Sequence, residues 1–168
     1  MPATQTPPAN TTKTIVMPPT TPPSAAARDL SLHIHKEVVI AASGKQVFES
    51  ILAQIGSEFT QHDGTPQPLK LELWPGGRWF RDLGNNAGHL WGHVQVIKPP
   101  TLLELYGPMF MSYAAINHVQ WRVTEQGPGK SLLTLTHRAF GDIAQGHREG
   151  VSEGWGFMMK MIAARVER

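Results

Sequence analysis

The chain has 168 residues, with 15 basic side chains, 13 acidic side chains and a formal net charge of +2. This length suits one domain with a single core, and the even charge balance without basic clusters argues against a nucleic-acid-binding surface. The absence of cysteine excludes disulfides and thiolate chemistry and favours a cytoplasmic location, and no apolar run is long enough to span a membrane.

The first segment, residues 1–28, holds seven prolines and seven threonines but no acidic residue. Such a composition cannot bury enough apolar surface to offset the entropy of ordering the chain. It also lacks the apolar run of a secretory signal. We therefore expect a disordered tail over residues 1–28 and one domain over residues 29–168.

The domain is expected to open with a strand over Leu32–Ile40, followed by a short helix. Ser43-Gly44-Lys45-Gln46 has the pattern of a capping box, and apolar residues then recur four apart, at Val47, Ile51 and Ile55. Gly56 is placed to end this helix. Residues 58–68 show no period and are expected to form a loop or a short irregular helix.

Six extended segments follow, each bounded by a glycine, proline or asparagine turn: Leu69–Leu73, Arg78–Leu83, Leu90–Val96, Leu102–Tyr106, Asn117–Val123 and Leu133–Arg138. Their alternation predicts one dry face and one wet face. In the third segment, alternation assigns Leu90, Gly92, Val94 and Val96 to the dry face, and His89, Trp91 and His93 to the solvated one.

The chain ends in an amphipathic helical stretch whose apolar stripe comprises Val151, Trp155, Met158 or Met159, Ile162 and Val166. A meander of antiparallel strands cannot bury its concave face alone, and this helix is the element left to cover it. The sequence therefore predicts an α+β helix-grip fold, a curved antiparallel sheet of about seven strands wrapped around a long C-terminal helix.

Four motifs occur in an order that resembles the START-like (SRPBCC) superfamily of helix-grip proteins: Trp74–Phe80, Gly92–Leu105, Leu133–His137, and Gly154-Trp155 opening a terminal helix. Within it, the chain is most similar to the bacterial branch related to the activator of heat-shock protein 90 ATPase. The resemblance covers roughly Leu32 to Arg168. It implies the fold but no single activity, because the superfamily includes lipid carriers, hormone receptors, polyketide cyclases and co-chaperone domains.

The sequence gives little support for a metal site or a catalytic nucleophile. Gly150–Gly154 matches a nucleophile-elbow pattern around Ser152, but no histidine follows it and no parallel strand precedes it. His33 with His35, and His89 with His93, are spaced to share a strand face, yet they lack carboxylate or cysteine partners at ligand spacing. No metal and no cofactor are expected, and paired carboxylates or a phosphate-binding glycine loop are also missing.

His137 differs from the other histidines because it shares the parity of Leu133 and Leu135 and should point inward. A structural hydrogen-bonding role comes first, contact with a ligand second and general acid–base catalysis third. Asn117 has the parity of Trp121 and either adds an amide contact or satisfies backbone groups.

Tryptophans and methionines suggest an apolar binding site, although each of them could simply fill the core. Met161 belongs to the same group of candidates, and the resemblance implies a cavity between sheet and helix. The expected ligand contacts are Asn117, Val119, Trp121, Leu133, Leu135, His137, Trp155, Met158, Met159 and Ile162.

The favoured function is therefore binding of a small hydrophobic molecule, and the residues give an enzymatic activity no support without excluding it. The first alternative is a co-chaperone-like module that contacts a protein partner through Trp74 and Trp91 on the outer face. The second is a polyketide cyclase- or dehydratase-like enzyme that uses His137.

Overall fold

The structure is a computed structural model that describes residues 29–61, 63–109 and 112–167. The expected tail over residues 1–28 lies outside the described residues. The elements are β1 (Ser31–Ile40), α1 (Gly44–Ile55), β2 (Lys70–Leu71), β3 (Arg78–Gly84), β4 (Ala87–Lys98), β5 (Leu102–Gly107), β6 (Ala115–Glu125), β7 (Ser131–Gly141) and α2 (Gln145–Val166).

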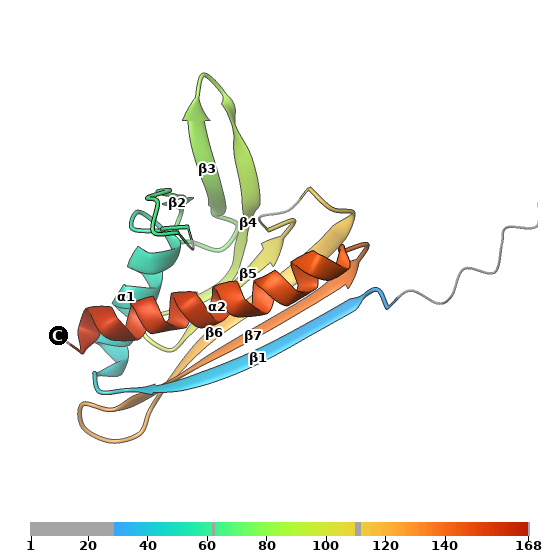
Figure 1. The fold of residues 1–168 in the computed structure, drawn as a ribbon. Coiled ribbons are helices and arrows are strands. Elements are labelled where there is room, and N and C mark those ends of the chain that lie inside the picture. The colour runs from blue at the N-terminus through green and yellow to red at the C-terminus, as the bar shows by residue number, and fades with distance from the viewer. Residues whose placement is uncertain (1–28, 62, 110–111, 168) are drawn as a thin grey trace, which may run out of the picture.

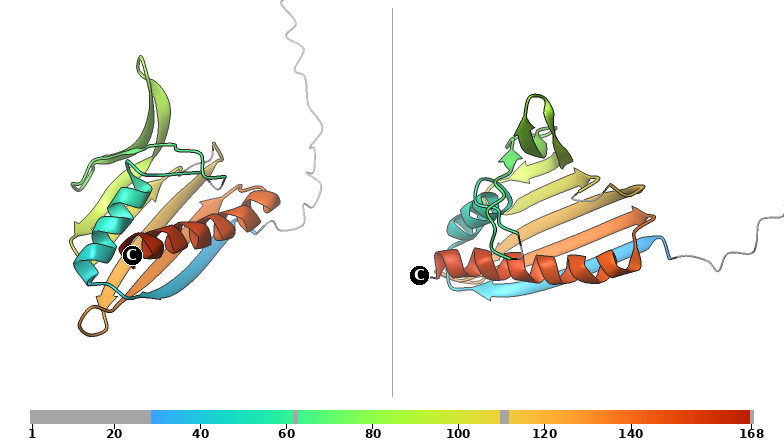
Figure 2. Two further views of the ribbon diagram at one scale, coloured as in Figure 1. Left: turned by 60° about the vertical axis from the view of Figure 1, so that its left-hand side comes forward. Right: turned by 45° about the horizontal axis from the view of Figure 1, so that its top comes forward.

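The strands form one seven-stranded sheet in the order β1-β7-β6-β5-β4-β3-β2, with antiparallel pairing throughout. The last strand, β7, thus pairs with the first, β1, and strands β2 to β7 form a meander in chain order. Both helices lie on the same face, where α2 runs along the sheet and α1 packs beside its C-terminal end (Figures 1 and 2). The α+β helix-grip fold predicted from the sequence is confirmed.

Helix α1 begins as predicted. The Ser43 side chain accepts a hydrogen bond from the backbone N–H of Gln46, and the Gln46 side chain accepts one from the backbone N–H of Ser43. These two bonds satisfy donors that the first turn leaves without partners. Gly56 ends the helix, and the residues four apart, Val47, Ile51 and Ile55, are all fully buried.

Strand β2 is shorter than the predicted Leu69–Leu73 segment. Only Lys70 and Leu71 pair with β3, and the side chain of Leu73 is 46% exposed. The ladder ends because the chain turns over Pro75–Gly77, where the backbone N–H of Gly76 donates to the carbonyl of Val94 instead. Alternation alone therefore overestimated this edge strand.

Strand β4 contains a bulge that reverses the predicted faces of its first half. The partner of Trp79 is Gly92 and the partner of Phe80 is Leu90, so Trp91 is the additional residue between two pairs. A bulge shifts the side-chain alternation by one position. Consequently Trp91 is buried and Leu90 is 45% exposed, the reverse of the sequence prediction, whereas the inward position of Val94 is confirmed.

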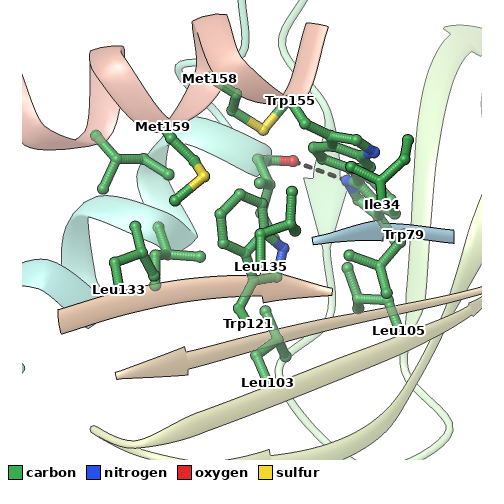
Figure 3. Close-up of a cluster of buried hydrophobic side chains, with 14 of the residues drawn as sticks. Ile34, Trp79, Leu103, Leu105, Trp121, Leu133, Leu135, Trp155, Met158 and Met159 are labelled. Atoms are coloured by element: carbon green, nitrogen blue, oxygen red, sulfur yellow. Dashed lines mark hydrogen bonds between the residues drawn. The ribbon is translucent and has the colours of Figure 1, made fainter. Parts of the chain in front are cut away.

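Helix α2 begins at Gln145, ahead of the Gly154-Trp155 pair that the resemblance placed at its opening. Its predicted stripe is confirmed, with Val151, Trp155, Met158, Met159 and Ile162 buried and Val166 partly buried against the core. Figure 3 shows Trp155, Met158 and Met159 reaching down from the helix towards the sheet side chains Trp121, Leu133 and Leu135. None of the described helices is long and apolar enough to cross a membrane.

Candidate functional site

A cavity of about 470 Å³ lies between the N-terminal half of α2, strands β3 and β4, and the segment that follows α1. This volume is in the range of pockets that hold small organic molecules. It is lined by Gln54, Phe59, Thr60, Gln61, Gln67, Trp79, His89, Trp91, Gly146, His147, Gly150, Val151, Gly154, Trp155, Phe157 and Met158.

Two tryptophans of the sheet and one phenylalanine of the segment after α1 form an aromatic wall. The ring centroid of Trp91 lies 5.0 Å from that of Trp79 and 5.2 Å from that of Phe59, both in edge-to-face geometry. The indole N–H of Trp79 donates to the carbonyl of Ile55 at 2.7 Å, which satisfies a carbonyl at the end of α1. This bond fixes the Trp79 ring and directs its N–H at the end of α1.

The helix side of the cavity is lined by glycines. Gly146, Gly150 and Gly154 are four residues apart, so they share one face of α2. Gly146 and Gly150 are exposed and Gly154 is half-buried, and a Cβ atom added at any of the three would meet nothing within 4 Å. Glycine in a helix interior costs about 1 kcal/mol relative to alanine, so this stripe reduces helix stability and leaves the backbone open to the cavity.

His137 lies behind this cavity, in a hydrogen-bonded chain of buried side chains. The Trp155 indole N–H donates to His137 Nδ1 at 3.0 Å, so Nδ1 is the acceptor. The other ring nitrogen, Nε2, therefore carries the proton and donates to Asn117 Oδ1 at 2.9 Å. Asn117 Nδ2 in turn donates to the carbonyls of Gly107 and Pro108.

The environment of this histidine keeps it neutral. Burial, together with a smaller effect of the charge of His118, lowers the pKa of His137 from 6.5 to about 4. With both ring nitrogens already bonded, His137 fixes the orientation of Trp155, which lines the cavity. The geometry corresponds to the structural role that the sequence analysis placed first.

The ten expected ligand contacts divide into two groups. Trp155 and Met158 line the cavity. The other eight are buried in the core and do not border it: Asn117, Val119, Trp121, Leu133, Leu135, His137, Met159 and Ile162. Met161 is 36% exposed and borders a second pocket of about 460 Å³ beside the end of α2.

Sequence reasoning missed most of the cavity lining. The repeat of Gly146, Gly150 and Gly154 was visible as a pattern, since glycines four apart in a helix must share a face. The residues from Phe59 to Gln67 carried no such signal because they belong to an irregular segment. Trp91 was assigned to the solvated face, and the bulge in β4 buries it at the cavity instead, whereas His89 is exposed as predicted and also borders the cavity.

The histidines do not gather around a metal position. Within residues 29–61, 63–109 and 112–167, no three side chains of histidine, cysteine, aspartate or glutamate come together. His35 contacts Glu37 and Thr136 on the exposed face of β1, while His93 contacts the carbonyl of Gly76. His89 and His147 border the cavity, where each can offer a polar contact.

Sequence comparison gives a family match that covers most of the chain. The model of "Activator of Hsp90 ATPase homolog 1-like protein" matches residues 41–167, which is 127 of 168 residues. A search of curated proteins finds no match.

Comparison with solved structures gives the same fold at low sequence identity. Protein CV1439 from Chromobacterium violaceum is 16% identical, with a TM-score of 0.60 over 81% of this chain and 97% of its own. CalU16 from Micromonospora echinospora is 20% identical, with a TM-score of 0.58 over 80% and 75%. The di-domain ARO/CYC BexL, from the BE-7585A biosynthetic pathway, is 16% identical, with a TM-score of 0.57 over 83% and 51%. At these identities the likeness establishes the fold alone.

Proposed function

This chain belongs to the family of Activator of Hsp90 ATPase homolog 1-like proteins, and we propose that it binds a small, mostly apolar molecule in the cavity beneath α2. The observation that carries the proposal is the pairing of an aromatic wall with a glycine-lined helix face. Gly146 and Gly150 are exposed and Gly154 is half-buried, so they border the open side of the cavity, where alanine would stabilise the helix more than glycine does. Glycine instead keeps that space available for a ligand.

The test is binding of N-phenyl-1-naphthylamine, a neutral apolar molecule whose fluorescence rises on leaving water. We expect saturable binding to the full chain. In the variant Gly150→Leu, the added side chain occupies the cavity, so affinity should fall at least tenfold, equivalent to about 1.4 kcal/mol. Leucine is a better helix former than glycine, so this variant should still fold.

The matched control is Glu153→Leu, which places the same side chain at a position of the same helix that is also exposed but does not border the cavity. It should bind the probe as the unmodified chain does. Equal affinity of the Gly150→Leu variant and this control would place the binding site elsewhere and contradict the proposal.

A second candidate, a module that contacts a protein partner, is supported by one exposed apolar pair. Leu73 and Trp74 are 46% and 55% exposed and follow one another where the chain leaves β2. Large exposed apolar side chains that adjoin one another are typical of interaction surfaces. Trp91, the other residue expected in this role, is buried and no longer supports it. A Trp74→Ser variant that still associates with a heat-shock protein 90 ATPase as the parent chain does would remove this candidate.

The cyclase-like alternative required His137 to reach a ligand. His137 lies behind Trp155 with both ring nitrogens bonded, so its geometry gives that alternative no support.

A further inference from the structure

One end of the cavity is bordered by a buried amide, Gln54, whose side chain is 1% exposed. Its Oε1 accepts a hydrogen bond from Arg165 Nη2 at 3.1 Å. Because arginine can only donate, this contact fixes which end of the amide is oxygen and which is nitrogen. The Nε2 group, with two N–H donors, is therefore the end that remains for other contacts.

Among residues 29–61, 63–109 and 112–167, the hydrogen bond that the structure gives the Gln54 side chain is the one its oxygen accepts from Arg165, and Gln54 borders the cavity. Buried amide donors are nearly always bonded, since leaving one unpaired costs free energy. The charge of Arg165 on the opposite end of the amide makes the N–H groups stronger donors. A hydrogen-bond acceptor on the cavity side would pair these N–H groups.

A second polar atom at the cavity also lacks a hydrogen-bond partner. Thr60 Oγ1 is buried and has no partner in the described part of the chain. Thr60 borders both the main cavity and the second pocket of about 460 Å³, as Gln54 does. The two unpaired groups therefore lie at the same end of the cavity, where the two pockets meet.

We propose that the ligand carries a hydrogen-bond-accepting oxygen, such as a carbonyl, that binds at Gln54 Nε2 and Thr60 Oγ1. This inference rests on the proposed function. The rest of the ligand is apolar and lies between the glycine face of α2 and the wall of Trp79 and Trp91. The pocket thus selects an apolar ketone or related carbonyl compound over the hydrocarbon of the same shape. Selection arises because only the carbonyl pairs the buried donors.

The experiment compares 9-fluorenone with fluorene, which have nearly the same shape and differ by the carbonyl oxygen. Quenching of tryptophan fluorescence gives the Kd of each with the full chain. We expect the ratio of the two affinities to favour fluorenone, and this preference to fall about 3- to 10-fold in the Gln54→Glu variant. Glutamate keeps an oxygen for Arg165 but replaces the N–H donors with an acceptor.

Thr60→Val is the second variant, because it removes the hydroxyl while preserving shape and needs no change in the core. It should lower the same ratio, with little effect on the Kd of fluorene. If both compounds bind and neither variant changes the ratio, the carbonyl site is wrong while the apolar cavity stands. If neither compound binds the unmodified chain, the proposed function fails and this inference with it.

Discussion

The two halves of α2 lie on the same sheet but meet different surroundings. The C-terminal half is packed and bonded, since the Ser50 hydroxyl donates to the Ile162 carbonyl and Arg165 donates to Ser50 and Gln54 of α1. The N-terminal half carries Gly146, Gly150 and Gly154 along the cavity. An apolar stripe therefore identifies which face of a helix turns inward. It does not predict whether that face packs against side chains or borders a cavity.

The largest effect is expected where the two halves join, at Trp155. The Trp155→Ala variant removes a buried aromatic side chain and leaves His137 Nδ1 without its donor. The free energy of unfolding, measured by urea denaturation, should fall by about 3–5 kcal/mol. The control Lys160→Ala changes an exposed position and should stay within about 0.5 kcal/mol of the parent. A small loss at Trp155 would mean that α2 does not grip the sheet through this residue.

The next effect depends on pH. The pKa of His137, about 4 in the folded chain, lies below its ordinary value of 6.5, so the unfolded chain binds the proton more readily between these values. The free energy of unfolding should therefore decrease as the pH falls from 7 to 4, by about 3 kcal/mol from this group.

Other groups titrate in the lower part of that range. Hydrogen bonds from Arg78 and Lys70 lower the pKa values of Glu72 and Asp82, so these carboxylates also lose stabilisation on acidification. The measurement is therefore the difference in slope between the parent chain and His137→Gln from pH 7 to 5. Identical slopes would show that His137 is not held neutral by burial.

A smaller loss is expected in the C-terminal half. The Arg165→Met variant keeps the apolar stem but leaves the backbone carbonyl of Ser50 and the amide oxygen of Gln54 without this donor. We expect a loss of about 1–2 kcal/mol in urea denaturation. Arg122→Met, at an exposed position on the sheet, is the matched control and should change little. Equal stability of the two variants would argue that packing alone holds this half.

The smallest effect has the opposite sign. Gly150→Ala should raise the free energy of unfolding by about 1 kcal/mol, because alanine favours the helix and its Cβ meets nothing within 4 Å. Ala164→Gly, in the other half, should lower it by about the same amount. The comparison is sharpened if the stabilised Gly150→Ala variant binds N-phenyl-1-naphthylamine less tightly. A loss of stability at Gly150 would mean that this position is not open.

Most of the fold followed from the sequence because local signals agreed with the global arrangement. The capping box at Ser43 and the stripe through Trp155 are confirmed, since each depends on neighbours three or four residues away. The bulge at Trp91 was not predicted because it depends on how two strands pair. The candidate site was the part least well predicted, because tertiary contacts bring its walls together.

Parity alone could not separate the core from the cavity lining. Val119, Leu133 and Leu135 point inward as predicted, yet they lie under the packed part of the sheet rather than at the cavity. The alternation within a strand determines which side chains point inward. Whether such a side chain borders a cavity depends on the size of the residues on the helix that faces it. Here the glycines of α2 leave room for a cavity.

The position of β1 at one edge of the sheet has a consequence for solubility. An edge strand of ten residues presents backbone groups that a second molecule could extend by pairing. Lys36, in the middle of β1, points to the same side as the buried Ile34, and its ammonium group lies near Gly156 of α2. A charge placed inward on an edge strand disfavours pairing with a second molecule, because docking there would desolvate it. We therefore expect this edge to protect the protein against strand-to-strand aggregation.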